Sequence, residues 1–316
     1  MKPDVSFVTC IYDDLSTTAF AGRHNRGTHY VFSLAQIHEM GVPIYCFIDK
    51  INMYRYFPAF LHFGLENFTF INYNLGDSPY FDRIQTVKES KPELYIDAIS
   101  WSSRCVEIMW GKFDWLVHVA EKIGLQEDRY LYWIDGGLSH EGVIPRKYNS
   151  KRPRSDMSDS FNNSSHEYSY QFANDLIFNK DFPDFLVETT GEGNLLHFMC
   201  SNPQHSDQSH LPRGGSHVGT GVGGLFGGDI TLLHQWATEG MQICDSLLEH
   251  GFIIKEEDIL THLINKHSKD DSDPFKDHLT MYWFDTWYHE DWNVYNPKQK
   301  SFAAFFEGFT EYRKNK

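Results

Sequence analysis

Asp135 is the residue whose neighbours point most clearly to chemistry. It follows an apolar run, residues 130–134, and precedes Gly136 and Gly137. The run predicts a buried strand, and ligands of open α/β sheets bind beyond the carboxyl ends of the strands. A carboxylate there suits Mn²⁺ or Mg²⁺ held together with substrate phosphates, and glycines let a ligand approach the backbone closely. The alternative is that Asp135 only caps a turn.

Aspartates also follow two other predicted strands. Asp13 and Asp14 come after residues 4–12, and Asp49 comes after residues 44–48. A carboxylate at a strand end can accept hydrogen bonds from a ribose or a base. Each of these aspartates can equally serve only to form a turn.

One cluster of basic residues lies in a segment rich in proline, serine and asparagine. Arginine pairs well with phosphate oxygens through its planar guanidinium, so the sequence predicts that this segment closes over a diphosphate. The alternative is a solvated loop. The basic residues are Arg146, Lys147, Lys151, Arg152 and Arg154.

The histidines raise the alternative of a metal-dependent hydrolase, but their spacing does not support it. No HExxH or HxH pattern occurs, and the serines beside histidines, Ser139 and Ser216, stand in no GxSxG sequence. The glycines at 219–224 lack the spacing and first-strand position of a dinucleotide-binding motif. The histidines concerned are His140, His197, His205, His210 and His217.

Composition limits the class of protein. The chain has 316 residues, of which 41% are hydrophobic, and a net charge of −15 from 28 basic and 43 acidic residues. Nucleic-acid-binding proteins usually carry the opposite charge, so we expect no nucleic-acid partner. Five scattered cysteines without a CxxC pair argue against a disulfide framework or zinc site. With no signal-peptide pattern and no run of about 20 apolar residues, we expect a cytoplasmic protein without a transmembrane segment.

The elements that must position Asp135 alternate along the first part of the chain. Continuous apolar runs predict strands, and apolar residues recurring every three or four positions predict helices. The alternation predicts an α/β fold with a mainly parallel, doubly wound sheet and helices on both faces. The predicted strands are residues 4–12, 44–48, 68–73 and 130–134, and the predicted helices are residues 28–40 and 100–123.

The remaining chain divides into a loop-rich insert and a second ordered half. Residues 142–220 are rich in Ser, Asn, Asp, His, Pro and Gly, which predicts a loop with short elements. The glycines at 223–228 predict a tight turn before a helix capped by Asp229. We expect one domain, 1–316, in which 1–141 and 221–316 form two halves around the insert. The second half ends in a segment dense in aromatic residues, 278–292, a residue type that lines sugar-binding grooves.

Three segments together resemble a known family. Residues 7–14, 133–137 and 223–228 are similar to the HtrL/YibB-like bacterial family, which is grouped with glycosyltransferases of lipo-oligosaccharide and capsule loci. The resemblance covers most of the chain outside residues 142–215. It implies a GT-A-like fold, in which 1–141 binds a nucleotide and 221–316 binds the acceptor.

The resemblance also implies site residues. Glu257 and Asp258 correspond to the acidic pair that supplies the catalytic base, and Asp135 with His289 corresponds to the ligands of Mn²⁺ or Mg²⁺, with His278 as a substitute. The usual second acid of the metal motif is replaced by Gly137, which leaves a metal requirement open. The residues expected at the nucleotide-sugar are Thr9, Tyr12, Asp13, Asp49, Asp135, Gly136, Gly137, Gly227, Gly228 and Arg146.

These features predict a glycosyltransferase, of the hexosyl-transferring type. We expect it to move a sugar from a nucleotide-diphospho-sugar, such as a UDP-sugar, to a glycan or glycolipid in bacterial surface polysaccharide or lipo-oligosaccharide synthesis. Peripheral attachment at the inner membrane is compatible with this activity. The alternatives are a non-catalytic nucleotide- or carbohydrate-binding protein of the same fold and the metal-dependent hydrolase.

Overall fold

The computed structural model describes residues 4–12, 26–92, 103–136, 180–199, 221–269, 273, 275–283 and 300–316. Within these ranges an eight-stranded sheet has the order β3-β2-β1-β4-β6-β5-β7-β8. Five of its seven pairings are parallel, and β6 is antiparallel to both of its neighbours. The strands are β1 (Asp4–Ile11), β2 (Ile44–Ile48), β3 (Phe68–Asn72), β4 (Arg129–Ile134), β5 (Leu195–Met199), β6 (Gly221–Asp229), β7 (Leu279–Trp283) and β8 (Lys300–Ser301).

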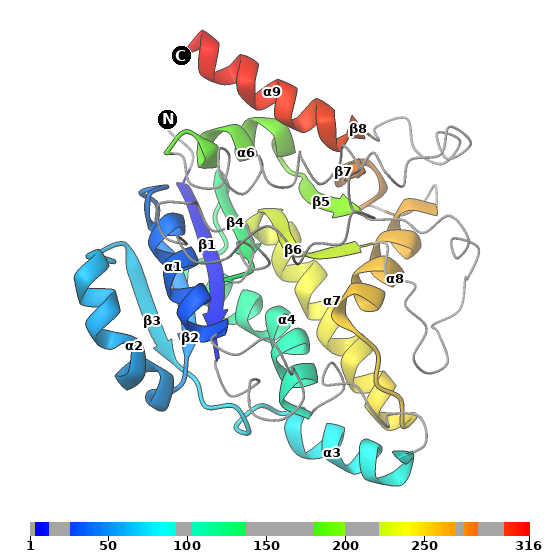
Figure 1. The fold of residues 1–316 in the computed structure, drawn as a ribbon. Coiled ribbons are helices and arrows are strands. Elements are labelled where there is room, and N and C mark those ends of the chain that lie inside the picture. The colour runs from blue at the N-terminus through cyan, green and yellow to red at the C-terminus, as the bar shows by residue number, and fades with distance from the viewer. Residues whose placement is uncertain are drawn as a thin grey trace, which may run out of the picture.

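Helices cover both faces of the sheet, so the described chain forms three layers (Figure 1). One face carries α1 (Arg26–His38), α2 (Lys50–Phe63), α6 (Phe182–Thr190) and α9 (Phe302–Asn315). The other face carries α3 (Phe81–Ser90), α4 (Ser103–Ile123), α7 (Ile230–Glu249) and α8 (Glu256–Lys269). A short 3₁₀ helix, η8 (Lys276–His278), precedes β7. None of the described helices is long and apolar enough to cross a membrane.

Alternate residues of the central strands enter the two apolar cores. In β4, Leu131 and Trp133 face the core beneath α4, α7 and α8, whereas Tyr132 and Ile134 face the opposite core. All four side chains are fully buried. Burial on both sides explains the continuous apolar runs in the sequence, because both faces of such a strand need apolar side chains.

The predicted α/β fold with a mainly parallel, helix-covered sheet is confirmed. Helices α2 and α3 were not predicted. Apolar residues lie on the exposed as well as the buried side of α2, and only Ile84 and Val87 of α3 are buried. Neither helix therefore has a clear apolar stripe. Helix α6 and strand β5 fall within the predicted insert, and β5 is an interior strand of the sheet.

The glycine block is a strand, β6, and not the predicted turn. Gly227 and Gly228 have φ angles of 147° and 151° in the middle of the sheet. A Cβ atom on Gly227 would lie 2.3 Å from the carbonyl oxygen of Leu131, and one on Gly228 would lie 2.2 Å from that of Asn194. Only glycine fits between β4 and β5 at these two positions.

Candidate functional site

The strand order places Asp135 where an α/β sheet usually binds its ligand. Strands β2 and β4 flank β1 on opposite sides and run parallel to it, so the chain order reverses between β1 and β4. Open α/β sheets bind ligands outside the carboxyl ends of the strands at such a reversal. Asp135 follows β4 directly at this edge.

The backbone holds Asp135 firmly while its side chain reaches solvent. Its N–H donates to the carbonyl oxygen of Gly224 at 2.7 Å, which extends the β4–β6 pairing by one residue. The next residue, Gly136, packs against β1, where a Cβ atom would lie 2.7 Å from the carbonyl oxygen of Cys10. The Asp135 side chain itself is 38% exposed. The sequence therefore anchors an accessible carboxylate at the edge of the sheet.

A buried lysine lies beneath this carboxylate. The ammonium nitrogen of Lys112, on α4, lies 2.8 Å from Oε1 of Glu256 and 4.0 Å from Oδ2 of Asp135. It also lies 5.3 Å from the ring centre of Trp133, within range of a cation–π interaction. Burial alone would lower the pKa of Lys112, but the charges of Glu256 and Asp135 outweigh it and raise the pKa. We call Lys112, Asp135 and Glu256 the Lys112 cluster.

Two further acids follow Glu256 in the first turn of α8. Burial, and then the charge of Glu256, raises the pKa of Glu257 to about 7. Burial likewise raises the pKa of Asp258 to about 6. Lys112 acts electrostatically on Glu257 and lowers its pKa in part, so this acid lies within range of the cluster. A carboxyl group with a pKa near neutrality can both take up and release a proton at physiological pH.

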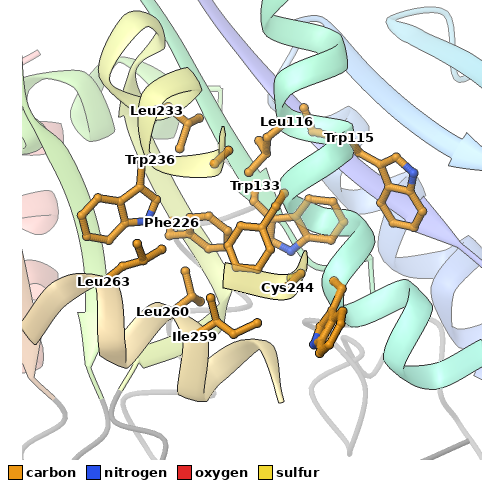
Figure 2. Packing of buried hydrophobic residues seen from close by; sticks show 14 of the residues in the cluster. Trp115, Leu116, Trp133, Phe226, Leu233, Trp236, Cys244, Ile259, Leu260 and Leu263 are labelled. Atoms are coloured by element: carbon orange, nitrogen blue, oxygen red, sulfur yellow. The ribbon is translucent and has the colours of Figure 1, made fainter. Parts of the chain in front are cut away.

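Stacked aromatic rings support the cluster from below. Trp133 stacks on Trp115 with 6.1 Å between ring centres, and Trp115 stacks on Phe47 with 5.0 Å between centres. Trp133 is also the register partner of Phe226 on β6. Figure 2 shows Trp133 and Phe226 next to each other above the apolar side chains of α8. This packing ties the strand that carries Asp135 to α4 and α8, which carry Lys112 and Glu256.

Three residues predicted to contact the nucleotide-sugar are buried in the described part of the chain. Both carboxylate oxygens of Asp49 accept hydrogen bonds from Asn52, so Asp49 caps α2. Tyr12 is buried, and its hydroxyl donates to the carbonyl oxygen of Tyr73 at 3.0 Å. Thr9 is fully buried. Asp49 and Tyr12 nevertheless lie at the same edge of the sheet as Asp135.

The other predicted residues divide into three groups. Gly227 and Gly228 pair with residues of β4 in the interior of the sheet, away from the edge at Asp135, and packing alone accounts for both. The substitute metal ligand His278 precedes β7, at the edge opposite Asp135, so it cannot join Asp135 as a ligand. Predictions that lie outside the described residues are Asp13, Gly137, Arg146 and His289.

The sequence prediction missed Lys112 and did not single out Glu256. Lys112 follows Met109 by three residues and precedes Leu116 by four, so it occupies the apolar stripe of its helix. A charged residue on such a stripe signals a buried partner, because an unpaired buried charge is very unfavourable. Glu256 is separated from Lys112 by 144 residues, and nothing local identifies it as the partner.

A metal ion fits this site only with help from a substrate. Among the described residues there is no group of three histidine, cysteine, aspartate or glutamate side chains that could hold one. Lys112 already balances part of the charge of Asp135, which weakens this carboxylate as a ligand. Mg²⁺ commonly binds through one or two carboxylates together with substrate phosphates. Asp135 can therefore serve as one ligand of an ion that a diphosphate brings with it.

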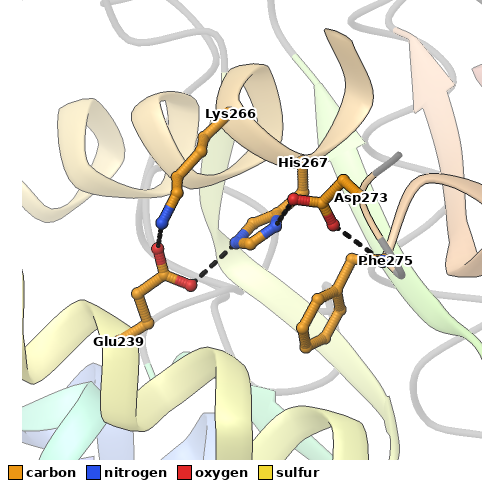
Figure 3. A network of polar contacts seen from close by, with 5 residues as sticks. All are labelled: Glu239, Lys266, His267, Asp273 and Phe275. Carbon is orange, nitrogen blue, oxygen red and sulfur yellow. Dashed lines mark hydrogen bonds and ion pairs between the residues drawn. The ribbon is translucent and has the colours of Figure 1, made fainter. Parts of the chain in front are cut away.

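A second polar cluster lies at the other end of α8 (Figure 3). Nε2 of His267 lies 2.7 Å from Oε2 of Glu239, and Nδ1 lies 2.8 Å from Oδ2 of Asp273. Lys266 pairs with the other oxygen of Glu239, and the N–H of Phe275 donates to the other oxygen of Asp273. We call Glu239, Lys266, His267 and Asp273 the His267 network. It joins α7 and α8 to the residues that precede η8.

His197 is the one histidine of the hydrolase alternative that lies in the described ranges, and it belongs to the core. It is 1% exposed, and burial lowers its pKa to about 3. Its ring stacks on Phe226 with 5.6 Å between ring centres. A neutral histidine packed in this way is inaccessible to a substrate.

Comparisons with known proteins include a distant likeness in structure. No protein-family model matches the sequence, and no curated protein matches it. The crystal structure of mouse xyloside xylosyltransferase 1 in its apo form is similar over 84% of this chain and 83% of that chain. The sequence identity is 10% and the TM-score is 0.37, and we draw no conclusion about activity from a likeness this distant.

Proposed function

We propose that the protein is a glycosyltransferase with a GT-A-like fold, which moves a sugar from a nucleotide-diphospho-sugar to a glycan acceptor. The observation that carries the proposal is the Lys112 cluster at the strand reversal, with an accessible carboxylate beside acids whose pKa values are near neutrality. The resemblance of the sequence segments around Asp135 and β6 to the HtrL/YibB-like family supports the same class of reaction.

Each group in the site has a proposed role. Glu257, with its pKa of about 7, takes the proton of the acceptor hydroxyl, and Asp258 is the second candidate for this base. Asp135 accepts hydrogen bonds from hydroxyl groups of the donor. Lys112 is a positioning residue, because it is buried and acts through Asp135 and Glu256.

Sugar transfer also requires stabilisation of the charge that develops on the leaving diphosphate. A Mn²⁺ or Mg²⁺ ion would supply it when bound to Asp135 and the phosphates. The metal requirement stays a prediction, as does the contribution of Arg146 and the basic residues that follow it in the sequence.

The substrates and setting also belong to the proposal. The donor is a UDP-sugar carrying a hexose, and the acceptor is a glycan or glycolipid of bacterial surface polysaccharide or lipo-oligosaccharide. The reaction takes place on the cytoplasmic side, where nucleotide-sugars are made. No nucleic acid takes part.

A ligand screen followed by a transfer assay tests the proposal. Nucleoside diphosphates and their sugars should raise the melting temperature, since ligands that bind the native state stabilise it by mass action. The best donor should be hydrolysed slowly without acceptor, and its turnover should rise as the pH rises through about 7, where Glu257 loses its proton. If no nucleotide at millimolar concentration changes the melting temperature, the proposal is wrong.

The absence of a second acid after Asp135 in the sequence favours one alternative, a non-catalytic nucleotide- or carbohydrate-binding protein. Binding without any donor hydrolysis, with or without Mn²⁺, would identify the protein as this binding module.

A further inference from the structure

Helix α2 carries an apolar surface on its outer side. Among the residues that the structure describes, five large hydrophobic side chains are exposed, and four of them belong to this helix. They are Ile51, Tyr54, Phe57 and Leu61, with exposed fractions of 63%, 74%, 50% and 66%. Figure 1 shows α2 at the outer end of the sheet, beside the edge strand β3.

The helix is firmly held, so this exposure does not come from a frayed end. Asp49 caps its first turn, and Gly64 ends it in the left-handed conformation, with its N–H bonded to the carbonyl oxygens of the last turn. The opposite side of α2 is buried through Tyr56 and Phe60. At 100° per residue, Ile51, Tyr54 and Leu61 fall on the side away from these two rings, and Phe57 lies at the border between the two sides.

The charges of α2 differ in sign from those of the chain as a whole. Its charged residues are Lys50 and Arg55, its titratable His62 is also basic, and it contains no acid. The chain carries a net charge of −15. Aromatic and aliphatic side chains flanked by basic residues are typical of helices that lie in the interface of an anionic membrane.

We propose that the outer side of α2 docks on an anionic lipid surface. Ile51, Tyr54, Phe57 and Leu61 enter the interfacial region, and Lys50 meets the lipid phosphates. A second copy of the chain is the less suitable occupant, because two α2 helices face to face would bring like charges together. The net charge of −15 opposes attraction to an anionic surface, so the binding must come from local side chains such as those of α2.

The position of α2 suits an enzyme that acts on a glycolipid. The N-cap of the helix, Asp49, lies at the same edge of the sheet as Asp135. The end of α2 nearest the candidate site is therefore its N-terminal end, which carries Lys50 and Ile51. The inference rests on the exposed side chains and charges of α2, so its failure would leave the proposed glycosyltransferase activity untouched.

Vesicle flotation with the purified full chain tests the proposal. We expect binding to vesicles of phosphatidylglycerol and phosphatidylethanolamine, and little binding to phosphatidylcholine vesicles. Replacing Ile51, Tyr54 and Leu61 together by serine should weaken binding about tenfold or more, because three inserted apolar side chains are lost. Lys50→Gln and added salt should weaken it less.

The matched control is Leu125→Ser, which removes an exposed leucine, 44% exposed, from another part of the molecule. This variant should bind anionic vesicles as the parent chain does, and all variants should keep the parent melting temperature. The proposal is overturned if the parent chain does not bind anionic vesicles, or if the triple variant binds them equally well. It is also overturned if the triple variant abolishes a dimer in solution, since the partner would then be a second copy.

Discussion

The two ends of α8 carry ionic clusters that differ in how completely their charges are paired. At the first turn, Glu256 shares Lys112 with Asp135. The charges of Lys112 and Lys255 lower the pKa of Glu257 by less than burial raises it. In the last turns, Lys266 and His267 together satisfy both oxygens of Glu239, and His267 also contacts Asp273. One helix therefore holds an electrostatically strained cluster and a satisfied one.

The pKa shifts of the carboxyl groups show the same contrast. Burial raises the pKa of Glu257 and of Asp258. Burial alone would also raise the pKa of Glu239, but hydrogen bonds from Lys266 and His267 outweigh it and lower the pKa. Strongly perturbed groups in a cleft are candidates for function, whereas saturated ion pairs are more often structural. This contrast agrees with our proposal of chemistry at the first turn of α8, and we expect the last turns to have a stabilising role.

The largest effect is expected from Lys112→Met. Removing one partner of a buried ion pair costs about 3–5 kcal/mol, because it leaves an uncompensated buried charge. The double variant with Glu256→Gln should recover part of this loss. Urea unfolding of the single and double variants measures both values. A loss under about 1 kcal/mol for Lys112→Met would show that Glu256 is solvated and the cluster is not closed beneath Asp135.

Asp135→Asn should lower kcat/KM for sugar transfer about 100-fold, as removal of one preorganised polar group commonly does. The melting temperature should stay near that of the parent chain, because the side chain is 38% exposed. The control is Asp245→Asn, which removes a carboxylate 50% exposed that pairs with Arg83. Full activity of Asp135→Asn would make Asp135 a turn residue.

Opposite pH trends should separate the two clusters. The pKa of Glu257 is higher in the folded chain than in the unfolded chain, so the unfolded chain loses this proton at lower pH. The free energy of unfolding therefore falls as the pH rises from about 5 to about 7. The melting temperature of Glu257→Gln should therefore rise relative to that of the parent chain as the pH rises.

The folded-state pKa of Glu239 is lowered, so its stabilising contribution is present above its unfolded pKa and disappears as pH falls. Glu239→Gln should therefore be less stable than the parent chain near neutrality, and the difference should shrink in acid. Melting curves measure the two trends, between pH 5 and 7 for Glu257→Gln and from neutrality to below about 4.5, the unfolded pKa, for Glu239→Gln. Parallel trends would contradict the assignment of one cluster as strained and the other as satisfied.

The smallest effect is expected from Lys266→Met. This lysine side chain is 52% exposed, and pairs of this kind contribute at most about 1 kcal/mol. Glu239 would still contact His267. Urea unfolding of Lys266→Met and of Lys112→Met gives the loss in free energy of unfolding for two lysine–glutamate pairs that differ mainly in burial. Equal losses would show that burial does not distinguish them.

Much of the fold could be predicted because its signals are local. The apolar runs at 44–48 and 130–134 needed only their own residues to indicate buried parallel strands, and the helix signal around Met109 and Leu116 lay within a few turns. The capping role of Asp49 was also available locally, since its partner Asn52 is three residues away.

The sequence by itself determined that Asp135 ends a buried strand and is followed by glycine. Only the tertiary structure decided that Lys112 lies beneath it and that Glu256 completes the cluster, since 144 residues separate the lysine from the glutamate. It also decided that the glycines at 227 and 228 fit between two strands instead of forming a turn. The physical reason is that strand and helix signals act over a few residues, whereas charge pairing and close packing depend on which distant segments the folded sheet brings together.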